Sequence, residues 1–183
     1  MSKPFSLGIM VGRFQTMHLG HEDMIRKACM LCDEVGVFIG SSQESDTEKN
    51  PFSYEIRRSF FKDVFGDSVR VAPLPDIGVG NNSRWGEYVL QHVEEKFGRL
   101  PDLLISGKEV RRLEWFDSVE GLKIAELYIP KTIHISASEM REFFVKNDFE
   151  SWKQYMNPVQ WGKYEMLRSL VLEAKDHKET ASI

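Results

Sequence analysis

Five short apolar runs recur along the chain, and stretches with helical spacing separate most of them. The runs cover residues 7–11, 35–39, 69–74, 103–105 and 125–129. Apolar runs of this length that alternate with helices indicate buried parallel strands joined by crossover helices. Because such crossovers are right-handed, the pattern predicts an α/β fold, with an open parallel sheet, helices on both faces and all strand carboxyl ends at one edge.

Helical spacing predicts the crossover helices and a helical end to the chain. The predicted helices cover residues 18–33, 54–65 after a Ser53 cap, 84–97 after Ser83, 138–144 and 160–175. Ser136 and Glu139 have the spacing of a capping box, which places Arg141 in the first turn of its helix. We expect one domain, with a core over residues 1–150, a C-terminal helical cap over 151–183 and a frayed polar tail from residue 176.

Composition excludes several classes of protein. The formal net charge of -4 and the pI near 5.8 argue against a general nucleic-acid binder, which would normally have a basic face. No apolar run approaches the roughly 20 residues that span a bilayer, so we expect no membrane role. The start lacks the apolar core of a secretory signal and two cysteines are too few for a disulfide framework, which predicts a cytoplasmic protein.

The first predicted strand is joined to the first predicted helix by residues 12–21, Gly-Arg-Phe-Gln-Thr-Met-His-Leu-Gly-His. His18 and His21 are three residues apart and therefore share one face of the first helical turn. Gly20 between them removes a side chain that would block a close approach. Because a helix that follows a strand offers backbone N–H groups and a positive dipole end to an anion, this segment predicts a phosphate-binding corner.

The segment closely resembles the His-x-Gly-His signature of the nucleotidyltransferase superfamily, and its first four residues resemble the nicotinamide mononucleotide adenylyltransferase family. Residues 135–141, Ile-Ser-Ala-Ser-Glu-Met-Arg, resemble the motif with which that family binds the ATP phosphates. Residues 40–45, 50–52 and 74–77, together with Trp85 and Tyr88, resemble the same family. The resemblance runs from about residue 7 to residue 144 and implies a Rossmann-like sheet. Two departures are Thr16, where the family usually has Pro, and Asp46, where it often has His.

The resemblance implies a role for individual residues. It places His21 on the α-phosphate of ATP, His18 on the neighbouring phosphates, and Arg13 and Arg141 along the phosphate chain. The further ATP-binding residues that it implies are Gly12, Phe14, Gln15, Gly20, Gly107, Ser136 and Ser138. The implied mononucleotide-binding residues are Ser41, Asn50, Asp76 and Trp85. No residue is expected to bind a metal, and Mg²⁺ is expected to arrive with the ATP phosphates because the sequence shows no cluster of carboxylates.

Some of these residues have a second interpretation. Trp85 could stack on the nicotinamide ring, or it could begin an apolar stripe with Val89, Val93 and Phe97 that faces the sheet. Lys108, Arg111 and Arg112 could contact phosphate or be solvated. Cys29 and Cys32 form a Cys-x-x-Cys, but a helix would separate Cys29 from His21 by about 12 Å, which is too far for a shared zinc ion.

Together the residues and the resemblance imply transfer of AMP from ATP to nicotinamide mononucleotide, giving NAD and pyrophosphate. Nicotinate mononucleotide stays open as a second substrate. A related cytidylyltransferase or pantetheine-phosphate adenylyltransferase would share the His-x-Gly-His motif and stays open, as does a weakly catalytic nucleotide-sensing regulator. A homo-oligomeric state is also left open.

Overall fold

The computed structural model describes residues 2–80, 82–107, 113–130 and 132–180, and its centre is a five-stranded parallel sheet. The strand order is β3-β2-β1-β4-β5, with every neighbouring pair parallel. The strands are β1 (Phe5–Gly12), β2 (Cys32–Gly40), β3 (Arg70–Leu74), β4 (Leu103–Ser106) and β5 (Ala125–Tyr128). Each lies within a few residues of a predicted run, so the Rossmann-like α/β fold is confirmed.

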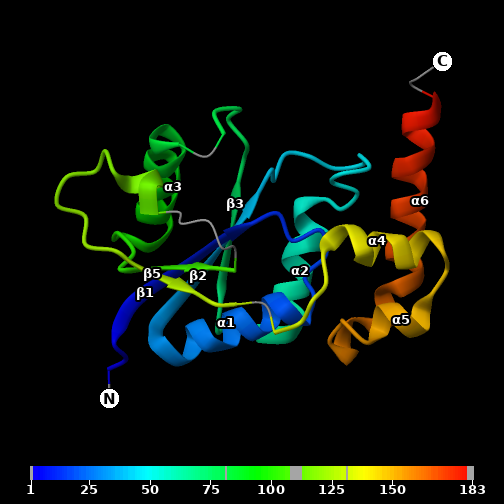
Figure 1. Ribbon diagram of the computed structural model, residues 1–183, viewed down its shortest axis with the longest axis horizontal. Helices are drawn as coiled ribbons and strands as arrows, with labels where there is room; N and C mark the ends of the chain where they lie inside the picture. The colour runs from blue at the N-terminus through cyan, green and yellow to red at the C-terminus, as the bar shows by residue number, and fades with distance from the viewer. Residues whose placement is uncertain (1, 81, 108–112, 131, 181–183) are drawn as a thin grey trace.

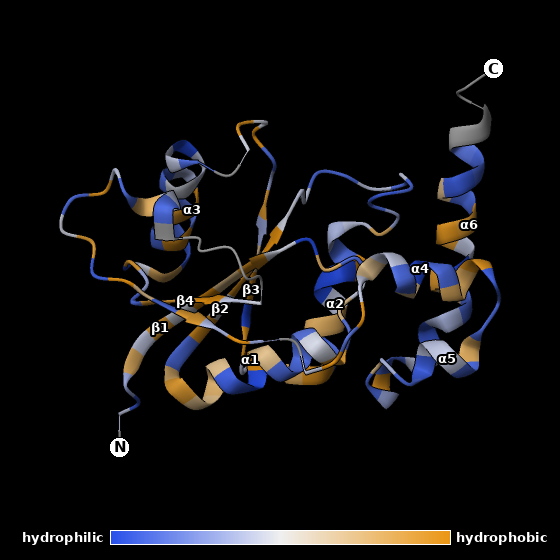
Figure 2. Cartoon of the chain, viewed as in Figure 1, coloured by the Kyte–Doolittle hydropathy of each residue, from blue (hydrophilic) through white to orange (hydrophobic). Residues whose placement is uncertain are grey.

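Helices cover both faces of the sheet, as Figure 1 shows. Alternate side chains of the apolar strands, which are orange in Figure 2, point to opposite faces. On one face, Met10, Val37 and Ile105 pack with α1 (Leu19–Leu31) and α2 (Tyr54–Phe65). On the other face, the apolar strand residues Ile9, Phe38 and Leu104 pack with α3 (Ser83–Phe97).

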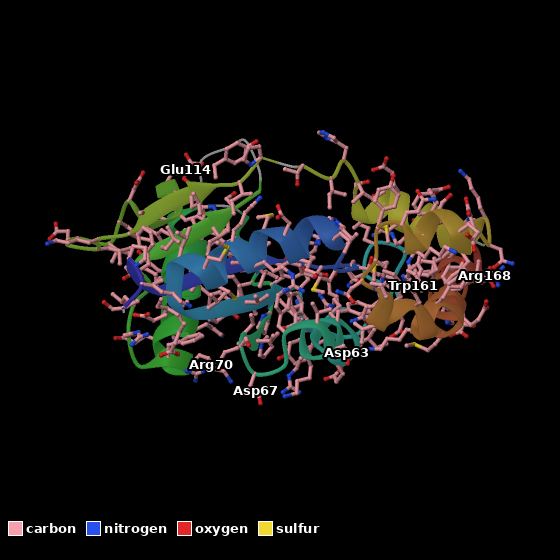
Figure 3. The ribbon with its side chains drawn as sticks, turned by 90° about the horizontal axis from the view of Figure 1, so that it is seen from below. Asp63, Asp67, Arg70, Glu114, Trp161 and Arg168 are labelled. Atoms are coloured by element: carbon pink, nitrogen blue, oxygen red, sulfur yellow. The ribbon has the colours of Figure 1, made fainter. Side chains whose placement is uncertain are left out.

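The C-terminal segments lie together at one end of the molecule (Figure 1). They are α4 (Ala137–Val145), α5 (Phe149–Lys153), the 3₁₀ helix η2 (Pro158–Lys163) and α6 (Tyr164–Thr180). Fully buried Trp152 and Leu167 join the apolar cluster of α1 and α2. Figure 3 shows Arg168, whose Nε donates to the carbonyl oxygen of Phe144 at 3.1 Å and so ties α6 to α4. A helical cap at this end was predicted; the division at residue 150 stays a prediction.

Several predicted boundaries and caps agree with the structure. Helix α2 has the predicted bounds, and the Ser53 hydroxyl oxygen accepts from the backbone N–H of Ile56. At α4, the Ser136 hydroxyl oxygen accepts from the N–H of Glu139, while the Glu139 carboxylate accepts from the Ser136 N–H. These contacts complete a capping box.

Other boundaries were wrong, for local reasons. Helix α1 ends at Leu31, because Cys32 and Asp33 already belong to β2. The cap of α3 is Asn82 and not Ser83. Residues 160–163 form a 3₁₀ segment, α5 was not predicted at all, and the tail is helical as far as Thr180.

A short 3₁₀ helix, η1 (Leu113–Phe116), packs closely against α3. A Cβ atom built on Gly86 would lie 1.7 Å from the carbonyl oxygen of Trp115. Only glycine permits this approach, which seats Trp115 beside Trp85 with their rings edge to face and their centroids 6.3 Å apart.

Candidate active site

A cleft of about 570 Å³ opens at the carboxyl ends of the strands. Its floor includes Gly12 at the end of β1, Gly40 at the end of β2 and Ser106 at the end of β4. Strands β2 and β3 lie on one side of β1, and β4 and β5 lie on the other. The cleft therefore occupies the point where the strand order reverses, which is the usual ligand site of such sheets, and its volume suits a nucleotide.

The cleft brings together residues that are far apart in the sequence. The predicted site residues that line it are Gly12, Arg13, Phe14, Gln15, His18, Gly20, His21, Ser41, Asp76, Trp85, Gly107, Ser136, Ser138 and Arg141. Asn50 was predicted there but does not line the cleft. Lys108, Arg111 and Arg112 lie outside the described residues.

The two histidines stand at the start of α1, with His18 at its N-cap. Their rings stack with centroids 3.9 Å apart. Nδ1 of His21 accepts a hydrogen bond from the backbone N–H of His18 at 3.4 Å. Because a neutral imidazole that accepts at Nδ1 carries its proton at Nε2, this contact assigns His21 as a donor through Nε2. A donor beside the positive end of a helix suits a phosphate oxygen.

The first turn of α1 is held by the C-terminal segments. The N–H of Leu19 donates to the carbonyl oxygen of Tyr155 at 2.8 Å. Asn157 donates through Nδ2 to both carboxylate oxygens of buried Glu22, at 3.2 and 3.1 Å. Gly20 lies against the His18 ring, and a Cβ atom there would be 3.1 Å from it. A larger residue at this position would therefore require the His18 ring to shift by a few tenths of an ångström.

Two arginines from opposite ends of the sequence meet at the cleft. Nη1 of Arg141 donates to the carbonyl oxygen of Gln15 at 3.1 Å, and Nη2 donates to Oγ of Ser138 at 3.2 Å. Burial, and secondly the charge of Arg13, lowers the pKa of the Arg141 guanidinium. Two cations that repel each other across a cleft form a field that favours an anion between them.

Gln15 and Asn50 connect this corner to the next loop. The Gln15 side chain accepts from the N–H of Phe52 at 3.0 Å and donates to the carbonyl oxygen of Phe52 at 3.1 Å. It also donates to Oδ1 of Asn50 at 3.5 Å, and Asn50 donates to the Glu44 carboxylate. Asn50 is buried, so in this structure it orders the loop and does not face the cleft. The Phe14 ring packs edge to face on His21, 5.0 Å between centroids.

Trp85 belongs to the apolar core and also lines the cleft. The side chain is 9% exposed and packs in the apolar cluster with Val89 and Val93, yet it also lines the cleft. Its indole Nε1 is buried without a hydrogen-bond partner among the described residues. Phe97, the end of the predicted stripe, packs at the edge of the same cluster.

Asp76 and Ser136 also make local contacts that stabilise the backbone, and Ser41 has an unusual backbone conformation. The Asp76 carboxylate accepts from the N–H of Gly78 at 2.8 Å, within a turn. The Ser136 hydroxyl is engaged with Glu139 in the α4 cap. Ser41 is buried and has a φ of 46°, in the left-handed region.

Among the residues that line the cleft but were not predicted as site residues are Lys49, Asp23 and Thr132. Lys49 adds an exposed cation, and its place directly before the Asn-Pro-Phe segment was the available signal. The Asp23 carboxylate is paired with Lys27 at 2.6 Å. Asp46, which departs from the family pattern, lies in a separate hollow beside α6.

Metal-binding side chains do not cluster in the described part of the chain, where no group of three or more His, Cys, Asp and Glu residues could hold an ion. Cys29 and Cys32 have free thiols at the far end of α1. Both of their carbonyl oxygens accept from Nζ of Lys3, at 2.6 and 2.9 Å. Within the same described ranges, no helix is long and apolar enough to cross a membrane.

A parallel α/β sheet with a cationic, histidine-bearing cleft at its switch point is the arrangement of a nucleotide-binding protein. Residues 9–143 match the family described as Cytidylyltransferase-like, and the chain belongs to this family.

Within the family, similar curated proteins carry the name nicotinamide-nucleotide adenylyltransferase, which agrees with the resemblance found in the sequence. The protein of Saccharolobus solfataricus is 40% identical over 105 residues, covering 52% of this chain and 60% of its own. That of Thermococcus onnurineus is 31% identical over 152 residues, covering 80% and 75%. The match to the Pyrococcus horikoshii protein spans 46% of that relative's length, so the chain matches only about half of some relatives.

Solved structures share the fold. A bifunctional NMN adenylyltransferase/ADP ribose pyrophosphatase from Francisella tularensis, solved with AMP and a manganese ion, aligns with a TM-score of 0.72 at 22% identity. The alignment covers 96% of this chain and 53% of that one. Plasmodium falciparum nicotinic acid mononucleotide adenylyltransferase aligns with a TM-score of 0.58 at 16% identity, covering 92% of this chain and 99% of that one.

Proposed function

We propose that this chain is a nicotinamide mononucleotide adenylyltransferase, which transfers AMP from ATP to nicotinamide mononucleotide and releases pyrophosphate. The observation that carries the proposal is the meeting of His18, His21, Arg13 and Arg141 in one cleft at the switch point. The names of the archaeal relatives support the choice of substrates. A cytoplasmic location and the lack of a nucleic-acid partner stay predictions, and the oligomeric state stays open.

The reaction requires the protein to position the two substrates and to stabilise negative charge. An oxygen of the mononucleotide phosphate forms a bond to the α-phosphorus of ATP, and the bond from that phosphorus to the bridging oxygen breaks in line. The electron pair leaves with pyrophosphate. The second pKa of a phosphate monoester is near 6, so the attacking group is already mostly dianionic at neutral pH and needs no general base. Fixed donors and cations around the developing charge then account for the catalysis.

Within this proposal, each histidine and each cationic side chain has a distinct role. Nε2–H of His21 donates to an oxygen on the α-phosphorus, where negative charge increases in the transition state. His18 and Arg141 bind the leaving phosphates, and Arg13 and Lys49 extend the positive field across the cleft mouth. Asp76 and Trp85 lie on the β3 and α3 side of the cleft, where the mononucleotide would bind.

Mg²⁺ is part of the proposal as a partner of the phosphates. The carboxylates that line the cleft belong to Asp23 and Asp76, and their oxygens already accept from Lys27 and from the Gly78 N–H. This donor set fits a metal that is held mainly by phosphate oxygens and water. When bound, Mg²⁺ would supply neutralisation of the phosphate charge.

The test is an assay of the purified chain with Mg²⁺ and a panel of substrate pairs. Pyrophosphate release and NAD formation are measured with ATP and either nicotinamide or nicotinate mononucleotide. CTP with a phosphoalcohol and ATP with phosphopantetheine serve as the rival pairs. The proposal expects the highest kcat/KM with ATP and nicotinamide mononucleotide.

Two results would reject this function. Equal or better turnover of CTP with a phosphoalcohol would make the chain a cytidylyltransferase. Binding of ATP and mononucleotide by calorimetry, without release of pyrophosphate, would make it a nucleotide sensor.

A further inference from the structure

Arg57, on α2, is a charged side chain inside the core, with none of its surface exposed. Its guanidinium has five N–H bonds, and all five donate to backbone carbonyl oxygens. Nε donates to Ser53 at 3.2 Å, Nη1 to Arg13 at 3.1 Å and Gly40 at 2.9 Å, and Nη2 to Ser41 at 3.1 Å and Glu44 at 3.3 Å.

These carbonyl groups belong to separate segments that meet at the cleft. Gly40 is the last residue of β2 and Ser41 follows it, while Arg13 directly follows β1. Arg13, Gly40 and Ser41 line the cleft, and Arg57 itself does not. One guanidinium therefore fixes the peptide groups at the ends of two neighbouring strands from behind the cleft wall.

Burying this charge is costly, and its hydrogen bonds offset that cost. Desolvation lowers the pKa of Arg57, and the carboxylates of Glu44 and Glu55 act against this effect. An apolar residue of similar volume would fill the core without the cost of desolvating a charge. What it would not supply is the planar fork that holds five carbonyl groups in fixed directions.

One of the held peptides needs such support. Ser41 has a φ of 46°, in the left-handed region that residues other than glycine adopt at an energetic cost. This conformation persists where the surroundings determine it, and the Nη2 bond to the Ser41 carbonyl oxygen is one such determinant. The bond to the Arg13 carbonyl oxygen likewise sets the direction in which the Arg13 side chain leaves the backbone.

We infer that Arg57 is a positioning residue for nucleotide binding and transfer: it holds the Arg13 and Ser41 peptides so that the cleft is shaped before the phosphates arrive. The expected change in kcat rests on the proposed function. The expected change in ATP affinity rests only on the cleft. Because misplacement of binding groups by about 1 Å can cost about 10²-fold in rate, the effect is measurable.

The first test variant is Arg57→Lys, which keeps the charge but has three donors for five acceptors. We expect the variant to fold, with the dissociation constant for ATP raised about 10-fold and kcat lowered about 10-fold. Arg58→Lys is the matched control, because Arg58 is the exposed neighbour on the same helix. It should leave both quantities unchanged. Leu167→Ala, at a fully buried site in α6, should lower the melting temperature without changing either quantity.

Chemical rescue distinguishes the hydrogen bonds of the Arg57 guanidinium from the volume that the side chain fills. In Arg57→Ala, added methylguanidinium should restore part of the ATP affinity and of kcat, because it can occupy the vacated fork position. Methylammonium at the same concentration should not.

Three results would overturn the inference. The first is Arg57→Lys with wild-type ATP affinity and kcat. The second is an equal loss in Leu167→Ala at a matched melting temperature. The third is an Arg57→Lys chain that does not fold at the assay temperature, since Arg57 would then serve global stability. If the wild-type chain binds ATP but makes no NAD, the proposed function fails, while the ATP-affinity comparison still decides the role of Arg57.

Discussion

The imidazole rings of His18 and His21 lie 3.9 Å apart with their planes at 28° to each other. The Phe14 ring supports His21 from another side, edge to face at 5.0 Å. Both histidines are thus held by packing and by the N-terminal turn of α1 before any ligand binds. A preorganised donor of this kind is most valuable where charge develops during the reaction.

His21→Ala should lower kcat by about 10² to 10³ and leave the melting temperature close to that of the wild type, because it removes one preorganised donor to the transition state. Steady-state kinetics and thermal melting measure the two quantities. His92→Ala on α3 serves as the control, since His92 does not line the cleft. An unchanged kcat would refute the role assigned to His21.

Arg141→Ala should raise the KM for ATP about 10-fold or more and change the KM for the mononucleotide much less. A hydrogen bond to a charged group contributes about 1.5 to 3 kcal/mol. Arg141 is on α4, where it donates to Ser138 in the first turn, whereas Trp85 is on α3. Lys146→Ala, at the exposed end of the same helix, is the control. Equal increases in the two constants would place Arg141 elsewhere on the substrates.

Trp85→Ala should lower the free energy of unfolding by about 3 to 5 kcal/mol, because the side chain is largely buried. If the indole also stacks on the nicotinamide ring, the variant should raise the KM for the mononucleotide more than the KM for ATP. Val93→Ala removes a buried side chain from the same stripe but outside the cleft. The stacking role would be rejected if Trp85→Ala and Val93→Ala both lost stability and neither raised the KM for the mononucleotide more than the KM for ATP.

Cys32 should react slowly with alkylating reagents at pH 8. Burial, together with nearby carboxylates such as Asp102, raises the pKa of its thiol to about 11, and only the thiolate reacts. The labelling rate should therefore increase about tenfold per pH unit from pH 8 toward pH 10. Because the pKa is raised in the folded state, the protonated thiol favours folding below the ordinary thiol pKa, and this contribution is lost as pH rises toward 11. Peptide mapping after timed labelling measures both cysteines; rapid modification of Cys32 at pH 8 in folded protein would contradict the burial.

The sheet could be predicted because β1, β2 and β4, its central strands, are largely buried on both faces, and such strands appear in the sequence as plain apolar runs. The sequence also predicted Ser53 and Ser136 as helix caps, because a capping side chain bonds a backbone N–H only two or three residues further along the chain. The position of His18 and His21 at the start of α1 could be predicted for a similar reason, since a strand, a turn and a helix start are contiguous in the chain.

Features that depend on distant contacts could not be found in this way. Asn50 looks like a ligand in the sequence, yet the bonds from Gln15 and to Glu44 turn it into the loop. Arg57 sits in an ordinary helical pattern, and nothing local shows that its partners come from the ends of two strands. The residues of α5 are too few to make a periodic signal, and they are helical because Trp152 is buried against the core.

The contacts of Tyr155 and Asn157 with the start of α1 bear on how this chain can be recombined with its relatives. A chimera that takes its C-terminal helices from another protein would replace the groups that close the first turn of the histidine-bearing helix. Even when both parents are active, such a hybrid should fold and yet hold His18 and His21 less firmly. Exchanges are therefore better tolerated when the donor segment keeps an amide side chain at position 157.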